Sequence, residues 1–449
     1  MLNKNTKHID LTQLPFISLN IDEIQALYKA TNFREFLKEK ILQAKSRIYI
    51  VALYLQSDEA GEELLRLIYQ KKSENPNIEI NIFVDWHRAQ RGLIGEKKSL
   101  GNAEFYRKLN DQYKHKINIF GVPIKTKELL GVLHLKGIII DDDVIYSGAS
   151  LNNVYLAKNV KYRYDRYHVI NNKYLSDVMV NYINTYFKGQ KAISSLINTS
   201  KLKHKLSKID IQNFRHNLQH SYYKLCKKQI SPNSIGAFPI VGFGKKNNKL
   251  NTIILNLILS SKSHVILCTP YFNFPLSVKR ALKKVMKNNI HVSIIVGDKQ
   301  ASDFYAHPDK PFKIISGLPY LYETKLRQYI KKHQQFIDND LLKIHLWKDG
   351  DNSFHVKGIW SDNDYMLITG NNLNPRAWRL DLENGILFKN NNNLMDSEWE
   401  KEINKITQKT KIIKSYNQID SINTYPPKIK TLLKRLKTFQ ADHVLNQLI

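Results

Sequence analysis

The chain has 449 residues, of which 42% are hydrophobic, and a formal net charge of +29. This length predicts two or three domains with substantial cores. Its only two cysteines, Cys226 and Cys268, exclude a disulfide framework and favour a reducing compartment. The longest strongly apolar run, residues 48–55, is far shorter than the ~20 residues of a membrane-spanning helix, and the first twenty residues lack the apolar core of a signal peptide.

The excess of lysine and arginine favours polyanionic partners. These partners include nucleic acid, a ribosome and an anionic membrane surface. Solubility alone is a second explanation of the charge. The net charge therefore does not choose between these roles.

Strands and helices alternate through the first half of the chain. After a loop-rich lead-in over residues 1–32, the predicted elements are a helix at 33–44, a strand at 47–55, a helix at 61–72, a strand at 78–84 with a loop at 85–95, and a strand at 116–122. This alternation predicts a layered α/β domain.

The second half repeats this order. Residues 261–265 parallel 44–48, residues 290–296 parallel 78–84, and the strand at 343–347 corresponds to that at 116–120. We therefore predict an α/β fold made twice. The predicted division is an N-terminal domain at 1–192, a basic helical bridge at 193–236, a C-terminal domain at 237–400, and a partly basic, amphipathic helical extension at 401–449.

Two segments outside the repeat have helical patterns. The bridge combines a basic side with an apolar stripe, formed by Lys201, Lys203, Lys205 and Lys208 and by Leu202, Leu206 and Ile209. The last helix, at 428–439, has one apolar face made by Ile429, Leu432, Leu433, Leu436 and Phe439. That face either packs on the protein's own core or lies on a membrane surface, and the sequence favours neither.

One short pattern, His-x-Lys-x4-Asp, occurs once in each half. Because side chains at i and i+2 of a strand share a face, we expect each histidine to lie beside its lysine. A single copy is weak evidence, but two copies, each followed by Gly-x-[Ser/Asn]-Leu-Asn, are far beyond chance. The copies are His134, Lys136, Asp141, Gly148, Ser150 and Asn152, and then His355, Lys357, Asp362, Gly370, Asn372 and Asn374.

These paired motifs resemble those of the phospholipase D superfamily, in which two His-Lys-Asp motifs meet at one phosphodiester site. Residues 85–92, 162–168 and 372–379 further resemble the bacterial CDP-diacylglycerol–serine O-phosphatidyltransferases of Gram-negative type. The resemblance covers nearly the whole chain. It implies two tandem phospholipase D-like α/β domains related by a pseudo-twofold axis, with the active site at their interface. The implied substrates are CDP-diacylglycerol and L-serine, and the products are phosphatidylserine and CMP.

Phosphodiester exchange needs a nucleophile, a proton donor for the leaving group, and cations for the phosphoryl oxygens. The resemblance implies that His134 forms a phosphatidyl-histidine and that His355 is the general acid and base. Four more side chains can bind the phosphoryl oxygens: Lys136, Lys357, Asn152 and Asn374. No cluster has zinc-ligand spacing, and the acidic run at 141–143 is typical of a turn, so we expect no metal or other cofactor.

Each catalytic histidine also needs an acceptor for the proton on its other ring nitrogen. Glu383, nine residues after Asn374, matches the acid that the superfamily places there. In the first half Asp165, thirteen residues after Asn152, is the best candidate. The resemblance implies a structural role for Asp141 and Asp362.

Substrate contacts are expected after the predicted strands, because ligands of α/β proteins bind at the carboxyl ends of strands. The candidates are Trp86, His87, Arg88 and Arg91 after one strand and Tyr271 after its counterpart. Arg88 and Arg91 have a second interpretation, in which they pair with nearby acids.

Other functions stay open at this point. They are a different phospholipase D-type enzyme, such as a phospholipase or cardiolipin synthase, a nuclease, and a non-catalytic scaffold on a membrane. Against a nuclease, the basic residues are spread widely and form no recognisable reader motif. We expect a cytoplasmic protein, peripherally associated with the inner face of the cytoplasmic membrane and without an integral span.

Overall fold

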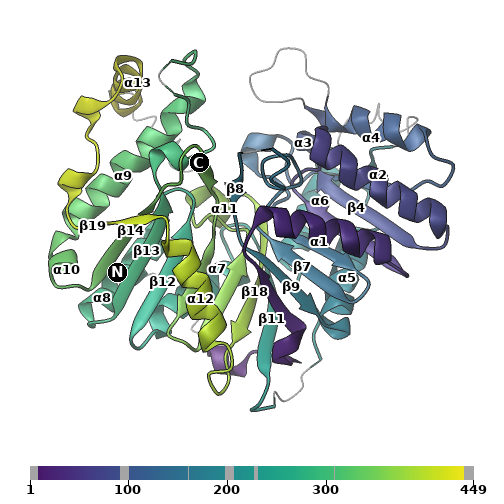
Figure 1. Ribbon diagram of the computed structural model, residues 1–449, viewed down its shortest axis with the longest axis horizontal. Helices are drawn as coiled ribbons and strands as arrows, with labels where there is room; N and C mark the ends of the chain where they lie inside the picture. Colours follow the sequence, from purple (N-terminus) through teal and green to yellow (C-terminus); the bar gives the residue numbers. More distant parts are fainter. Residues whose placement is uncertain are drawn as a thin grey trace.

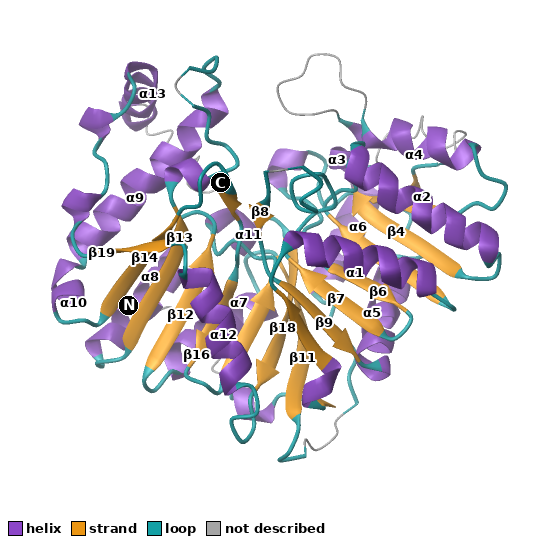
Figure 2. Ribbon diagram, in the orientation of Figure 1, coloured by secondary structure: helices purple, strands orange, loops and turns teal. Residues whose placement is uncertain are grey.

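The computed structural model describes residues 9–91, 101–159, 161–197, 207–226, 231–307 and 309–438. Two β-sheets lie side by side, the first-half sheet on the right and the second-half sheet on the left of Figure 1. Helices lie over both of them (Figure 2). The protein is thus an α/β structure, as predicted from the alternating pattern.

The first sheet has the strand order β10-β5-β4-β3-β6-β7-β9-β2. Its strands are β2 (Ile24–Leu27), β3 (Arg47–Ala52), β4 (Glu79–Asp85), β5 (Asn118–Val122), β6 (Gly137–Ile140), β7 (Asp143–Ser147), β9 (Tyr167–Asn171) and β10 (Ser194–Ser195). The second sheet has the order β1-β11-β18-β17-β16-β12-β13-β14-β19. Its strands are β1 (Ile17–Leu19), β11 (Ile235–Phe243), β12 (His264–Thr269), β13 (His291–Gly297), β14 (Leu342–Trp347), β16 (Gly358–Ser361), β17 (Tyr365–Thr369), β18 (Leu382–Lys389) and β19 (Thr410–Ile413).

The two sheets share one topology. The run β5-β4-β3-β6-β7-β9-β2 corresponds strand for strand to β14-β13-β12-β16-β17-β18-β11. In both runs the first three strands are parallel and the following pairs are antiparallel. The predicted duplication of one α/β unit is therefore confirmed.

The helices pack on the sheets according to the alternation of strand side chains. In β3, Ile48 and Ile50 face a core that includes residues of α1 and α2, whereas Tyr49 and Val51 face a core with α5. The helices are α1 (Ala30–Gln43), α2 (Glu59–Glu74), α3 (Trp86–Gln90), α4 (Asn102–Asp111), α5 (Lys173–Tyr186), α6 (Lys208–Gln219), α7 (Lys249–Ser260), α8 (Leu276–Lys287), α9 (Leu318–Lys332), α10 (Gln334–Asp338), α11 (Pro375–Arg379), α12 (Asp396–Thr407) and α13 (Pro427–Thr438).

One hydrophobic core is shared by the two halves. It contains Leu133 and Tyr146 from the first half together with Trp360, Met366 and Leu382 from the second, all almost fully buried. Apolar burial of this kind is the main stabilising term in folding and in association. The halves are therefore packed into one body, and the histidine motifs lie where they meet.

Three predicted segments differ from the structure. The lead-in is not only loop: β1 pairs with β11 in one sheet and β2 with β9 in the other, so this segment links both sheets. The predicted loop at 85–95 begins with α3, which Asp85 caps by accepting a hydrogen bond from the Arg88 amide. Strand β6 begins only at Gly137, so His134 and Lys136 precede it.

Helix α13 packs on the protein itself. Ile429 and Leu433 are buried in a small cluster with Tyr320 of α9 and with Tyr425. Figure 1 shows α13, in yellow, above α9 at the upper left. The structure thus favours the core interpretation of this face; Phe439 lies outside the described residues.

The bridge is described only in part. Lys201, Lys203, Lys205, Leu202 and Leu206 lie outside the described residues. In α6, which follows, Ile211, Phe214 and Leu218 form the buried face, and Ile209 is 69% exposed, so Ile209 is not part of the apolar stripe. In the part of the chain that the structure describes, no helix has the length and apolar character needed to cross a membrane.

Candidate active site

Each histidine-bearing segment pairs with a strand of the opposite half. The His134 amide donates to the Leu382 carbonyl, and the Leu382 amide donates to the Val132 carbonyl. In the second copy, β15 (Ser353–Phe354) runs parallel to β8 (Arg163–Tyr164), and the His355 amide donates to the Tyr164 carbonyl at 2.8 Å. The motif segments therefore leave their own sheets and join the two halves.

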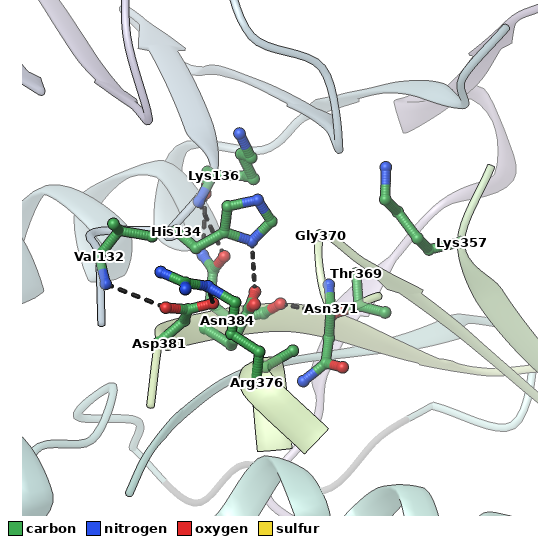
Figure 3. A network of polar contacts seen from close by, with 12 residues as sticks. Val132, His134, Lys136, Lys357, Thr369, Gly370, Asn371, Arg376, Asp381 and Asn384 are labelled. Atoms are coloured by element: carbon green, nitrogen blue, oxygen red, sulfur yellow. Dashed lines mark hydrogen bonds and ion pairs between the residues drawn. The ribbon is translucent and has the colours of Figure 1, made fainter. Parts of the chain in front are cut away.

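Each motif histidine also contacts the side chain of an acid that belongs to the opposite half. His134 Nδ1 lies 2.9 Å from Glu383 Oε2, and His355 Nδ1 lies 3.0 Å from Asp165 Oδ2. Figure 3 shows the contact of His134 as a dashed line below the ring. Each imidazole is thus oriented through its Nδ1 by a carboxyl group of the other half. Nε2 of His134 has no hydrogen-bond partner among the described residues, whereas Nε2 of His355 lies 3.2 Å from the hydroxyl of Tyr155.

The lysines cross the interface as well. A Cβ atom added at Gly148 would lie 3.0 Å from Lys357 Nζ, and one at Gly370 would lie 3.0 Å from Lys136 Cγ. A side chain at either glycine would therefore push against the lysine of the opposite half. This explains why both motifs place a glycine after the turn.

The motif asparagines use their oxygen atoms locally. Asn374 Oδ1 accepts from the Ala377 amide and caps α11, and Asn152 Oδ1 accepts from the Tyr155 amide. Among the described residues, the Nδ2 groups of both side chains have no hydrogen-bond partner. They are therefore available as donors to a bound group.

The cationic side chains of the site are destabilised in their charged forms. Burial and the charge of Lys357 lower the pKa of Lys136 to about 7, and burial lowers that of Lys357 to about 8. Burial and Lys136 lower the pKa of His134 well below its usual value, and burial with Lys357 lowers that of His355 to about 4. In the free site both imidazoles are therefore neutral, and the charged forms of the two lysines are disfavoured. A bound anionic phosphodiester would stabilise these charged forms.

The two carboxyl groups differ in charge state. Burial and the neighbouring Asp381 raise the pKa of Glu383 well above that of an ordinary carboxyl. Burial also opposes the ionisation of Asp165, but Lys357 and the hydrogen bond from His355 lower its pKa overall. Asp165 is therefore ionised at neutral pH, whereas Glu383 ionises only at a higher pH than an ordinary carboxyl group.

Asp141 and Asp362 lie away from this centre, at the start of β3 and of β12. The carboxylate of Asp141 accepts the amides of residues 45–47, and that of Asp362 accepts those of residues 262–264. Both aspartates have a positive φ, 50° and 49°. They close equivalent tight turns, which fits a structural role.

Several residues around His355 belong to neither of the two sequence motifs. The hydroxyl of Tyr155 lies 3.0 Å from His355 Nδ1, and the guanidinium of Arg163 lies 4.6 Å from the centre of the Tyr155 ring. Arg163 also pairs with Asp303, whose carboxylate accepts the hydroxyl of Tyr271. Sequence reasoning missed Tyr155, Arg163 and Asp303 as site residues, because Tyr155 lies in the turn after the motif, Arg163 in β8 and Asp303 in a loop of the other half, and only folding brings them together.

The residue that follows each acid reaches the backbone of the opposite lysine. Asn384, after Glu383, accepts from the Lys136 amide at 2.9 Å and donates to the Lys136 carbonyl at 2.8 Å. Arg166, after Asp165, donates to the Lys357 carbonyl at 3.2 Å. The shared position next to the acid was a signal that sequence reasoning could have used.

The substrate-contact candidates have mixed surroundings. Trp86 is buried in the core of the first half, against Gly121, and Arg91 pairs with Glu128 at 2.6 Å. The guanidinium of Arg88 lies over the ring of Tyr54, and His87 Nε2 lies 2.8 Å from the Lys125 carbonyl. Of this set, Tyr271 lies beside a motif histidine, with its ring centre 6.4 Å from that of His355.

Within the described ranges, no three His, Cys, Asp or Glu side chains are grouped so that they could hold a metal ion.

Known proteins resemble this chain over its whole length. It is 43% identical to the CDP-diacylglycerol–serine O-phosphatidyltransferase of Haemophilus influenzae, with all of both chains covered, and 43% identical to that of Escherichia coli K12, with all of this chain and 98% of the relative covered. The crystal structure of phosphatidylserine synthase from Haemophilus influenzae superposes with a TM-score of 0.95 over 98% of each chain. Residues 254–418 match the family described as cardiolipin synthase, PLD-like domain. The chain belongs to the CDP-diacylglycerol–serine O-phosphatidyltransferase family of phospholipase D-like enzymes.

Proposed function

We propose that this protein transfers a phosphatidyl group from CDP-diacylglycerol to L-serine, giving phosphatidylserine and CMP. The chain is 43% identical, over its full length, to two enzymes of that name, and this similarity supports the substrate pair. The observation that carries the chemistry is the reciprocal site, in which each histidine is held by a carboxyl group of the other half. Such a site can hold one phosphorus atom between two imidazoles.

In the first step, Nε2 of His134 attacks the phosphorus that carries the diacylglycerol. The bond from this phosphorus to the CMP oxygen breaks, and His355 gives a proton to that oxygen. His355 is neutral in the free site and gains this proton when the anionic substrate binds, because the substrate and ionised Asp165 then favour the imidazolium form. Nucleophilic His134 carries its proton on Nδ1 throughout, so Glu383 must be a carboxylate to accept the hydrogen bond from that N–H. The products are CMP and a phosphatidyl-histidine.

In the second step, the hydroxyl of L-serine gives its proton to His355, and the seryl oxygen attacks the same phosphorus. The bond between phosphorus and His134 breaks, which releases phosphatidylserine and restores the imidazole. Ionised Asp165 stabilises the imidazolium form of His355 that this step creates.

The phosphoryl oxygens carry the negative charge in both steps. Lys136 and Lys357 neutralise it, and the Nδ2 groups of Asn152 and Asn374 donate hydrogen bonds to it. The lowered pKa values of the lysines support this assignment, because the free site lacks the anion that would compensate their charge.

The description of the matched family model favours a second candidate, a cardiolipin synthase-like exchange with a glycerol-bearing acceptor. The test is to supply labelled CDP-diacylglycerol with L-serine, with phosphatidylglycerol or with water as the only acceptor, and to identify the lipid products. We expect phosphatidylserine and an equal amount of CMP with serine. Cardiolipin from phosphatidylglycerol, with no phosphatidylserine from serine, would reject the proposed substrate pair in favour of the second candidate.

We also propose that the protein works on the inner face of the cytoplasmic membrane, as a peripheral protein bound to anionic lipid rather than to nucleic acid. Exposed apolar side chains occur in two short 3-10 helices on the connections that follow strands: Leu129 and Leu130 in η3 (Glu128–Leu130) after β5, and Ile314 in η6 (Ile314–Gly317) after β13, the last being 76% exposed. Arg376 ties the first of these loops to the site by donating to the Glu128 and Leu129 carbonyls. Exposed lysines, Lys127 and Lys313, stand close to these apolar side chains in the sequence, and this combination suits an anionic membrane better than a nucleic acid backbone.

Vesicle co-sedimentation tests this placement. Leu129→Ser and Ile314→Ser should each weaken binding to vesicles that contain acidic lipid, while Ile209→Ser, at an exposed position on α6, should not. Binding should also fall at 1 M salt, where charges are screened beyond ~3 Å. Equal binding to neutral and acidic vesicles, unchanged by salt, would contradict the proposal.

A further inference from the structure

Beside His355 lies a pair of opposite charges that the transfer chemistry leaves without a task. Arg163 Nη2 and Asp303 Oδ2 are 3.5 Å apart, and their side chains keep 15% and 18% of their surface exposed. The neighbouring Asp165, by contrast, is 1% exposed and already occupied by His355 and Lys357. Arg163 and Asp303 therefore form the part of this cluster that reaches solvent.

The arginine has unused hydrogen-bonding capacity. Its Nε donates to Ser353 Oγ at 3.1 Å, which fixes the guanidinium, and Tyr155 packs against its face. Its Nη groups make no hydrogen bond to any described residue, and the separation from Asp303 is an ion-pair distance rather than a hydrogen bond. A guanidinium held in this way can bind a carboxylate through two parallel hydrogen bonds.

The aspartate is placed by a different loop. Tyr271 donates its hydroxyl to one carboxylate oxygen, Oδ1, and its ring lies beside His355. The other oxygen, Oδ2, is the one that faces Arg163. The neighbourhood of His355 thus offers a fixed cation and a fixed anion. Arg163 is held through Nε and keeps its Nη groups for a ligand, and Asp303 is held through Oδ1 and keeps Oδ2.

L-Serine carries an ammonium and a carboxylate on one carbon atom and the reacting hydroxyl on the next. We propose that Arg163 and Asp303 form the acceptor subsite, in which Arg163 binds the carboxylate of serine and Asp303 binds its ammonium group. The zwitterion then lies antiparallel to the protein ion pair, and its hydroxymethyl group is directed to His355. This inference rests on the proposed function and adds to it the residues that select serine as the acceptor.

The half-site of His134 supports the assignment by contrast. The position two residues before the acid, where Arg163 precedes Asp165, is occupied there by Asp381 before Glu383. Asp381 pairs with Arg376, which also donates to two backbone carbonyls, so this pair is bound to its own surroundings. The side chain at the position of Tyr155, three residues after the motif asparagine, is Ala377 there. The residues suited to a zwitterion thus accompany only the histidine that deprotonates the acceptor.

The test combines variants of the protein with truncated acceptors. Ethanolamine is serine without its carboxylate, and 3-hydroxypropanoate is serine without its ammonium group. Each is measured as an acceptor and as a competitive inhibitor against serine, in detergent micelles that contain CDP-diacylglycerol. The variants are Arg163→Gln and Asp303→Asn, with Arg66→Gln and the exposed Asp309→Asn as matched charge controls.

We expect the KM for serine to rise at least tenfold in both variants and to stay unchanged in both controls, because a charged partner is removed. Arg163→Gln should leave the affinity for ethanolamine nearly unchanged, and Asp303→Asn that for 3-hydroxypropanoate. A residue that merely supports the fold would weaken all three acceptors alike, which is the logic of a double-mutant cycle.

Unchanged ratios between serine and the truncated acceptors in both variants would overturn the subsite. If Arg163→Gln does not fold, Asp303→Asn decides alone, since this change preserves the shape of the side chain. Wild-type protein that makes no phosphatidylserine would refute the proposed function. Active wild type, together with variants in which the ratios between serine and the truncated acceptors are unaltered, would refute the subsite only.

Discussion

The two half-sites share a frame but differ in what surrounds it. In both, a histidine contacts an acid of the other half, and a lysine passes over a glycine of the other half. On the His134 side the residue that follows the acid is neutral, and this residue, Asn384, binds both the amide and the carbonyl of Lys136. On the His355 side the residue at the same position is Arg166, which binds the Lys357 carbonyl and forms a buried ion pair with Glu402 at 2.7 Å.

This difference separates what the repeat must keep from what it can vary. The groups that handle the phosphate occur in both copies, because one phosphorus atom has to be held from two sides. The acids, and the residues beside them, set how readily each histidine gains a proton. We interpret the ionised Asp165 as support for proton transfer at His355, and the later-ionising Glu383 as the partner of a histidine that stays neutral until it attacks.

Replacing the histidines should give the largest effect and should separate the two roles. His134→Ala should lower kcat by at least ~10⁴-fold and abolish any phosphatidyl adduct, because the nucleophile is gone. His355→Ala should lower turnover by ~10²–10⁴-fold, the usual contribution of a general acid and base, and should still permit an adduct on His134. Mass spectrometry of protein that has been incubated with CDP-diacylglycerol and then quenched checks this prediction. An adduct on His355 would reverse the roles.

The buried ion pair should make the His355 side the more sensitive in stability. Glu402→Gln leaves the charge of Arg166 buried without its partner, which should cost about 3–5 kcal/mol of unfolding free energy. Replacing both residues by methionine should restore part of this loss. Asn384→Ala, in the neutral network of the other side, should cost only about 1–3 kcal/mol. Urea unfolding measures all three, and a Glu402→Gln variant as stable as wild type would remove this contrast.

The two acids should differ in their pH profiles. Because Glu383 must be ionised to accept the hydrogen bond from His134 Nδ1, its raised pKa sets the acidic limb of kcat/KM, and activity rises as pH rises through that pKa. Glu383→Gln should therefore move this limb to lower pH, with a maximum lower by about 10²-fold through loss of alignment. Asp165→Asn should lower the maximum but leave the limb in place, because the pKa of Asp165 is already lowered. Identical limbs in wild type and Glu383→Gln would exclude Glu383 as the titrating group.

The glycine contacts should give the smallest effect. Gly370→Ala presses a methyl group on Lys136 Cγ, and Gly148→Ala presses one on Lys357 Nζ and Asp165 Oδ2. Shifts of a few tenths of an ångström at groups that contact phosphate should lower kcat about tenfold. Thermal unfolding serves as the control for each variant. Full activity in both would show that the lysines do not need this close approach.

The fold was predictable to the extent that it is repeated. Matching segments such as 44–48 and 261–265 predicted one α/β unit made twice, and the shared strand order confirms it. The loop-rich lead-in contains two strands that were not predicted, because β1 and β2 are short strands at sheet edges whose partners, β11 and β9, lie far along the chain.

The site was predictable only where it follows a local pattern. The spacing of His134, Lys136 and Asn152 suggested their common role, but spacing within one half cannot show that the acids are exchanged across the interface. Asp303 stands in a loop with no motif, and it comes beside His355 only through Tyr271 and Arg163. Such contacts depend on how the two halves pack, which no local pattern records.

The central claim is that the two halves form one phosphodiester site rather than two. A crystal structure with tungstate, a phosphate analogue, tests this claim most directly. We predict a single ion between His134 Nε2 and His355 Nε2, with both lysines and the Nδ2 groups of Asn152 and Asn374 in contact with its oxygens. Two separate ions, each held by the histidine and lysine of one half alone, would contradict the account.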